Sequence, residues 1–135
     1  MTDVIVEVLV NIALWAIASV LAAAFLFAGG AKLAQPKDKF VASGMAWAEP
    51  FPAGLIKTIG ALEVLAAVGL ILPALLDIAP VLVPLAALGL ALIMVGAIIV
   101  HARRREFQSV AMNVVLLLLA AVVAWGRFGP YSFTS

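Results

Sequence analysis

Four long apolar stretches alternate with three more polar connections along the 135-residue chain. Each stretch approaches or exceeds the roughly 20 residues that a helix needs to cross about 30 Å of hydrocarbon. None shows the two-residue alternation of a transmembrane β-barrel, and backbone groups in lipid must be paired internally. The pattern therefore predicts four membrane-spanning helices, over residues 4–28, 53–72, 78–100 and 107–126.

Prolines and short connections predict how these helices follow one another. Pro73 is expected to close the second helix, and Pro80 and Pro84 to lie in the opening turns of the third, where a missing N–H costs least. The second and third helices are then joined by a tight turn near residues 74–79, and the third and fourth by residues 101–106. Short connections favour an all-α, antiparallel four-helix bundle, formed as a single membrane domain by the whole chain.

The connection between the first and second helices is longer and mixes aromatic side chains with charged ones, over residues 29–52. Gly29 and Gly30 are expected to end the first helix and let the chain turn back. The rest of the segment is expected to form a short amphipathic helix in the membrane interface, with Trp47 at the depth of the headgroups.

The composition agrees with a membrane protein and narrows the chemistry. Hydrophobic residues make up 67% of the chain and charged residues 11%, which is too apolar for a soluble domain of this length. The net charge of +1 gives no sign of nucleic-acid binding. The absence of cysteine and the single histidine, His101, exclude disulfides, cysteine-ligated metals and a bis-histidine haem within one chain. We expect no metal and no cofactor.

Basic side chains gather on one side of the predicted bundle: Lys32, Lys37, Lys39, Lys57, Arg103, Arg104 and Arg105. The positive-inside rule then places the first and third connections in the cytoplasm and both termini outside, in the inner or plasma membrane. Most of these side chains are expected to contact lipid headgroups, Lys57 by snorkelling. On the opposite side Arg127 either pairs with Glu7, or the two charges snorkel separately.

Glu63 is the most informative residue, because it lies near the middle of the second predicted helix. A lone carboxylate at that depth costs at least about 2.5–3.5 kcal/mol, so it should face the interior of the bundle. Either it forms a proton or ligand site, or it makes an interhelical hydrogen bond that fixes packing. Lys32 is a better-placed partner than Lys57, although Lys32 could equally be a surface lysine at a helix end.

Other polar and small residues inside the predicted helices are expected to act in helix packing. Asn11 and Asn113 are expected to hydrogen-bond between helices, at depths too different for a bond to each other. Gly89 and Gly96 are expected to give the third helix a smooth face that another helix can approach.

Two short stretches carry a recognisable pattern. Residues 25–33 (FLFAGGAKL) end on glycine, lysine and leucine, and residues 59–65 (IGALEVL) place a glycine before the glutamate. With the approach from Trp47 to Pro52, they make the chain resemble the DoxX-like family of small four-helix membrane proteins. The resemblance marks four residues as candidate polar or ligand-binding positions within the membrane: Gly29, Lys32, Gly60 and Glu63. It also implies a link, in some members, to quinone-coupled sulfur oxidation or oxidative-stress complexes.

Three hypotheses for function follow. The first is a non-catalytic accessory or assembly subunit of a larger complex, with other integral membrane proteins as partners and no catalytic residues. It rests on the small size and on the lack of a phosphate loop, nucleophile motif or zinc spacing. The second is a quinone-linked redox subunit that uses Glu63 and Lys32. The third is a small lipid or solute carrier, whose cavity at Glu63 would be built by a homo-oligomer.

Overall fold

The structure, a computed structural model, describes residues 2–133 and is helical throughout its ordered elements. These elements are α1 (Thr2–Ala34), α2 (Lys37–Ala42), the 3-10 helix η1 (Ala46–Ala48), α3 (Ala53–Leu76), α4 (Leu82–Arg103) and α5 (Phe107–Phe128). Four of them, α1, α3, α4 and α5, are long and apolar enough to cross a membrane. The prediction of an all-α four-helix membrane bundle is therefore confirmed.

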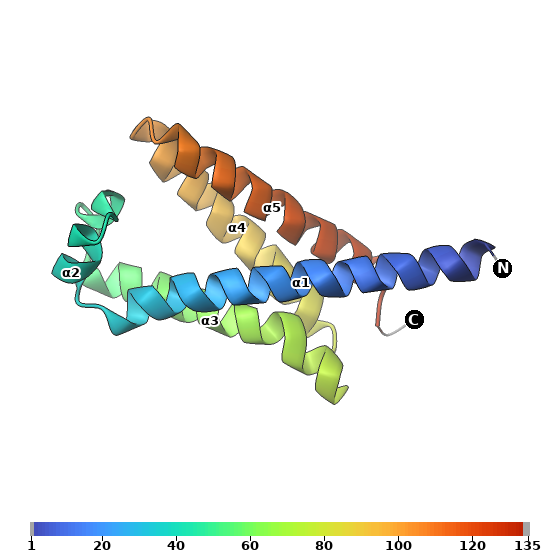
Figure 1. Cartoon of the computed structure of the whole chain (residues 1–135). Helices are drawn as coiled ribbons and strands as arrows, with labels where there is room; N and C mark the ends of the chain where they lie inside the picture. The colour runs from blue at the N-terminus through green and yellow to red at the C-terminus, as the bar shows by residue number, and fades with distance from the viewer. Residues whose placement is uncertain (1, 134–135) are drawn as a thin grey trace.

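The long helices form two antiparallel pairs, α1 with α3 and α4 with α5 (Figure 1). The pairs meet through contacts of α3 with α4 and of α1 with α5. Toward the end of the molecule that holds α2 they diverge (Figure 1). The segment of α2 and η1 lies at this open end and limits the space between the pairs.

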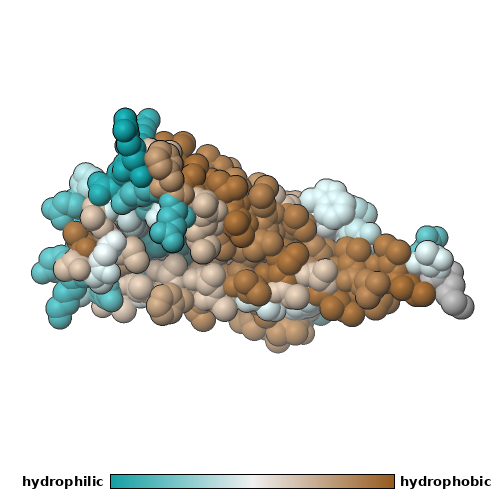
Figure 2. All heavy atoms as spheres, turned by 45° about the horizontal axis from the view of Figure 1, so that its top comes forward, coloured by the Kyte–Doolittle hydropathy of each residue, from teal (hydrophilic) through white to brown (hydrophobic). Residues whose placement is uncertain are grey.

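A buried apolar core lies where the two pairs meet. Its members are Ala18, Leu21, Phe25, Ala67, Leu70, Val83, Ala87, Leu90, Met94, Ala120 and Val123. Most other large apolar side chains face outward, and they form a broad hydrophobic surface beside a polar end (Figure 2). This distribution suits a protein whose helices are solvated by lipid, which does not penalise exposed apolar groups.

The first helix pair is in backbone contact at two glycines. A Cβ at Gly29 would stand 2.6 Å from the carbonyl oxygen of Gly60, and a Cβ at Gly60 would stand 2.9 Å from the carbonyl oxygen of Gly29. The prediction that Gly29 and Gly30 end the first helix is wrong, because α1 continues to Ala34. Gly29 is required by the approach of α3 and not by a turn.

The prediction for Pro73 is also wrong, since this buried proline lies inside α3, which continues to Leu76. A proline removes only its own N–H from the hydrogen-bond ladder, so the residues after it can still donate to the preceding turn. The helix ends instead at Asp77, whose φ of 53° is left-handed, with Ile78 N–H donating to Pro73 O at 3.0 Å. Pro84 lies in the first turn of α4, as predicted, but the same prediction is wrong for Pro80, which precedes the helix in the turn before it.

The expected smooth face of α4 is not used for close helix contact. No neighbouring atom lies within 4 Å of the position that a Cβ would take at Gly89 or Gly96. The buried stripe of α4 passes through Val83, Ala87, Leu90 and Met94, and neither glycine lies on it. The tight small-residue contact of this helix is with Gly69 of α3, where a Cβ would meet Ala86 Cβ at 3.1 Å.

Candidate functional site

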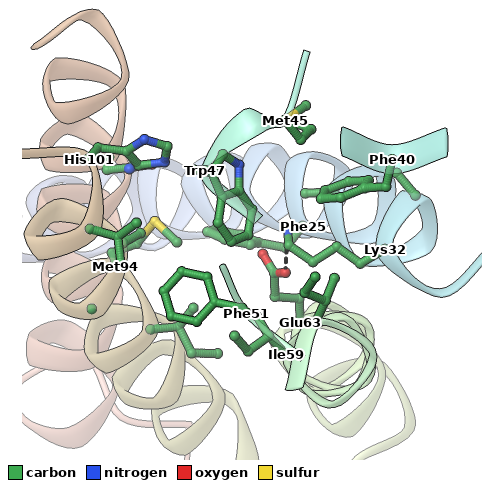
Figure 3. Close-up of a pocket in the computed structure, with 18 of the residues that line it drawn as sticks. Phe25, Lys32, Phe40, Met45, Trp47, Phe51, Ile59, Glu63, Met94 and His101 are labelled. Atoms are coloured by element: carbon green, nitrogen blue, oxygen red, sulfur yellow. Dashed lines mark ion pairs between the residues drawn. The ribbon is translucent and has the colours of Figure 1, made fainter. Parts of the chain in front are cut away.

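A cavity of about 520 Å³ lies between the diverging helix pairs. All four long helices contribute to its walls, and four residues of the first connection, here called the roof, line it too: Phe40, Met45, Trp47 and Phe51 (Figure 3). Apolar and aromatic side chains dominate the lining, and the charged or strongly polar side chains are Lys32, Glu63, His101 and Asn113. A cavity of this size and lining is typical of sites for small lipophilic molecules.

Lys32 and Glu63 form a buried ion pair in the wall of the cavity. Lys32 Nζ lies 2.8 Å from Glu63 Oε1, and the two side chains are 12% and 3% exposed (Figure 3). The opposite charges attract each other across the contact between α1 and α3. Lys32 follows Gly29 by one turn of α1 and Glu63 follows Gly60 by one turn of α3, so in the antiparallel pair the two charged residues flank the glycine contact.

The roof packs aromatic rings around the lysine. Lys32 Nζ lies 5.9 Å from the ring centroid of Phe40 and 5.9 Å from that of Trp47, both within cation–π distance. Trp47 makes edge contacts with Phe40 and Phe51, at centroid distances of 6.0 and 6.2 Å. The three aromatic residues of the roof therefore form a connected cluster that shields one side of the ion pair.

His101, in the last turn of α4, joins the roof to the second helix pair. Its ring centroid lies 5.9 Å from that of Trp47. Its Nδ1 lies 2.9 Å from Glu106 Oε1, to which Arg104 Nε also donates at 3.1 Å. The hydrogen bond with His101, aided by the charge of Arg104, holds the pKa of Glu106 below its ordinary value. An ionised Glu106 in turn fixes the orientation of the imidazole beside Trp47.

Two of the lysines expected at the headgroups bond to backbone carbonyl groups. Lys57 Nζ donates to Leu33 O at 2.8 Å and to Gln35 O at 2.6 Å, at the C-terminal end of α1. Lys37 Nζ donates to Glu49 O at 2.8 Å and so closes the first connection. A helix C-terminus leaves carbonyl groups without partners, and a nearby ammonium satisfies them and complements the helix dipole. As expected, Lys57 does not pair with Glu63.

The remaining basic residues of this end are exposed: Lys39, Arg103, Arg104 and Arg105. Their contact with lipid headgroups stays a prediction.

Arg127 lies at the opposite end and is only 5% exposed. Its Nη1 donates to Asn11 Oδ1 at 2.8 Å and to Tyr131 O at 3.0 Å, and its guanidinium lies 3.9 Å from the ring centroid of Phe133. Glu7 is exposed, and no ion pair joins it to Arg127. Arg127 bonds to Asn11 and not to Glu7, because Asn11, one turn further along α1, is level with the guanidinium.

The two asparagines have different roles. Asn11 bonds between helices through Arg127, whereas Asn113 lines the cavity and its Nδ2 is buried without a hydrogen-bond partner. Both asparagines were predicted to act in helix packing. The sequence did not predict that the roof and Met94 would line a cavity. The aromatic residues before Pro52 carried a signal, but aromatic residues near a membrane interface are common enough to explain them without a cavity.

Fold and site together define a small multi-pass membrane protein with an apolar internal cavity. A family model described as the DoxX-like family matches residues 16–123, which include the ion pair, the roof and Asn113. The chain therefore belongs to the DoxX-like family. No curated protein matches it, and no solved structure does.

Proposed function

We propose that this protein binds a lipophilic small molecule within the membrane, in the cavity between its helix pairs. One observation carries the proposal: a single buried ion pair, Lys32–Glu63, lies in the wall of an otherwise apolar cavity of about 520 Å³. Apolar walls receive the body of the ligand, and a few placed polar groups orient its head.

The ion pair also bears on the charge of the ligand. Lys32 and Glu63 neutralise each other, so a charged head group would enter a largely apolar cavity without a counter-charge from this pair. The ligand is therefore an uncharged amphiphile. A quinone has these properties, and so does an uncharged lipid. The quinone-linked hypothesis and the carrier hypothesis both require that an uncharged amphiphile binds in the cavity. The cavity supports this binding, which the two hypotheses share.

Photo-labelling tests the binding step directly. The probe is para-decylbenzophenone, which on irradiation inserts into nearby C–H bonds and favours methionine side chains. Met45 and Met94 line the cavity, whereas Met112 is 60% exposed on α5 and does not line it. In purified protein in lipid nanodiscs, adducts at Met94 should saturate with probe concentration. Adducts at Met112 should rise linearly, since that side chain samples only probe dissolved in the lipid.

A matched pair of variants makes the test specific. Gly96 lines the cavity and Gly89 does not, and neither position has a neighbouring atom within 4 Å of an added Cβ. Gly96→Leu should therefore reduce saturable labelling of Met94, while Gly89→Leu should leave it unchanged. Labelling of Met94 that never saturates, or that ignores Gly96→Leu, would contradict ligand binding in this cavity.

An accessory or assembly role in a larger membrane complex is the second candidate, and α1 favours it. This helix has 33 residues and is ~50 Å long by helical rise, well beyond the ~30 Å of hydrocarbon. Residues 2–9 are all exposed, and they extend beyond the other helices (Figure 1). Mild-detergent purification from the native membrane should then recover a stoichiometric integral membrane partner. Recovery of the chain alone would contradict this role and leave the cavity as its function.

A further inference from the structure

We propose that the side-chain amide of Asn113 is the second polar anchor of the cavity and donates a hydrogen bond to an acceptor oxygen of the bound lipophile. This inference rests on the proposed function and narrows its ligand class. The ligand would be an uncharged lipophile that carries a carbonyl or a comparable acceptor oxygen, and a plain hydrocarbon would not satisfy the site.

Among residues 2–133, Asn113 is the polar cavity residue whose side-chain nitrogen has neither a hydrogen bond nor an ion-pair partner. Lys32 and Glu63 pair with each other, and His101 bonds to Glu106. Asn113 Nδ2 is buried, and within residues 2–133 it makes no hydrogen bond. Buried polar atoms are paired in the great majority of cases, so an unpaired donor that lines a cavity calls for a partner from outside the chain.

The location of Asn113 distinguishes it from another unpaired amide of the protein. Gln35 Oε1 is also buried without a partner, but Gln35 lies after the end of α1 and does not line the cavity. Asn113 lies in the second turn of α5, inside the span. An asparagine in a membrane-spanning helix that bonds to no other helix gains nothing from packing, because lipid offers its amide no partner.

The two polar positions come from different helix pairs. The ion pair belongs to α1 and α3, and Asn113 belongs to α5 of the other pair. A ligand bound both at the ion pair and at Asn113 would bridge the two diverging helix pairs. Because the buried atom is the amide nitrogen, the ligand group that satisfies it is an acceptor.

Two competitors of nearly the same shape test the inference. Para-decylacetophenone carries a carbonyl, and para-decylethylbenzene has a methylene group in its place. Each is titrated against para-decylbenzophenone, and loss of the Met94 adduct gives its half-inhibitory concentration. We define the ratio as the half-inhibitory concentration of the hydrocarbon divided by that of the ketone. Measured within one variant, this ratio reports the hydrogen bond alone, because the affinity of the protein for the probe cancels. In the wild-type protein the ketone should compete better.

Asn113→Leu should lower that ratio by about 3- to 10-fold, the range for one neutral hydrogen bond. The fall in the ratio should come from the lost hydrogen bond to the ketone, because the hydrocarbon has no acceptor for the Asn113 amide. Leu116→Val, which alters a neighbouring apolar lining residue of α5, should change both competitors together. An unchanged ratio in Asn113→Leu, or an equal fall of the ratio in Leu116→Val, overturns the role of Asn113.

The apo protein gives an independent readout. Asn113→Leu removes a buried donor without a partner, so the thermal transition in ligand-free nanodiscs should stay or rise. A fall would show that Asn113 supports the fold and would overturn the inference. Absence of saturable Met94 labelling in the wild-type protein would instead refute the proposed function, and the inference with it. Saturable labelling with an unchanged ratio would refute the inference alone.

Discussion

Lys32 and Glu63 stabilise the helix pair only while both are present. Burial costs each charge its hydration, and their mutual attraction offsets this cost only in the paired state. The side chains are 12% and 3% exposed, and the rings of Phe40 and Trp47 keep water from one side of the lysine. Loss of either partner would leave a largely buried charge without its counter-charge.

Lys32→Met should therefore lower the free energy of unfolding by about 3–5 kcal/mol, the range for breaking a buried pair. Lys32→Met combined with Glu63→Gln should recover much of that loss, because no unpaired charge remains. Titration with sodium dodecyl sulfate in mixed micelles measures the double-mutant cycle. Lys39→Met is the control, since Lys39 is exposed, and it should change little. Additive losses in the double variant would show that the two side chains are not coupled.

The sequence predicts which way a charged side chain in a membrane helix must face. It does not predict which residues of neighbouring helices lie at the same level. The cost of a carboxylate in lipid leaves Glu63 only the bundle interior, so its placement could be predicted. The contact of Arg127 with Asn11, and the lack of any partner for Asn113, depend on the register between antiparallel helices. Hydropathy does not encode that register, so neither outcome could be predicted.

Among the elements, α1 and α3 show how much depends on one glycine contact. The four spans follow from length and hydropathy, and the structure has them. Their ends were not predictable, because a glycine pair is compatible with a turn or with a close crossing, and a proline with a helix end or its interior. Here the crossing of α1 and α3 decides the role of Gly29, and the close approach of the two helices brings Lys32 within reach of Glu63.

Gly29→Ala and Gly30→Ala should have opposite effects on stability. A Cβ at Gly29 would stand 2.6 Å from a backbone oxygen of α3, whereas a Cβ at Gly30 would meet no atom within 4 Å. Gly29→Ala should cost about 1–3 kcal/mol through overpacking. Gly30→Ala should be neutral or gain up to about 1 kcal/mol from helix propensity. The same detergent titration measures both, and equal effects would contradict a backbone crossing at Gly29.

Across the whole molecule, most of the hydrophilic surface lies at the end that holds α2 and the turn between α4 and α5 (Figure 2), where the basic side chains of Lys39, Arg103, Arg104 and Arg105 are exposed. Their concentration supports the proposal that this end faces the cytoplasm and that both termini face outward.

Single cysteines test this orientation cleanly, because the native chain has none. Lys39→Cys should react with a membrane-impermeant maleimide only after the cells are permeabilised. Asp3→Cys, near the start of α1, should react in intact cells. The reverse labelling pattern would show that the predicted topology is inverted. It would not change the contacts between the helices.

The divergence of the two helix pairs also has a consequence for the bilayer around the protein. The end with α2 spreads over a wider cross-section than the opposite end, where α1 extends alone (Figure 1). A body of this outline displaces more lipid from one leaflet than from the other. The molecule is therefore a wedge, and it should be least costly to accommodate where the leaflet around its broad end is convex.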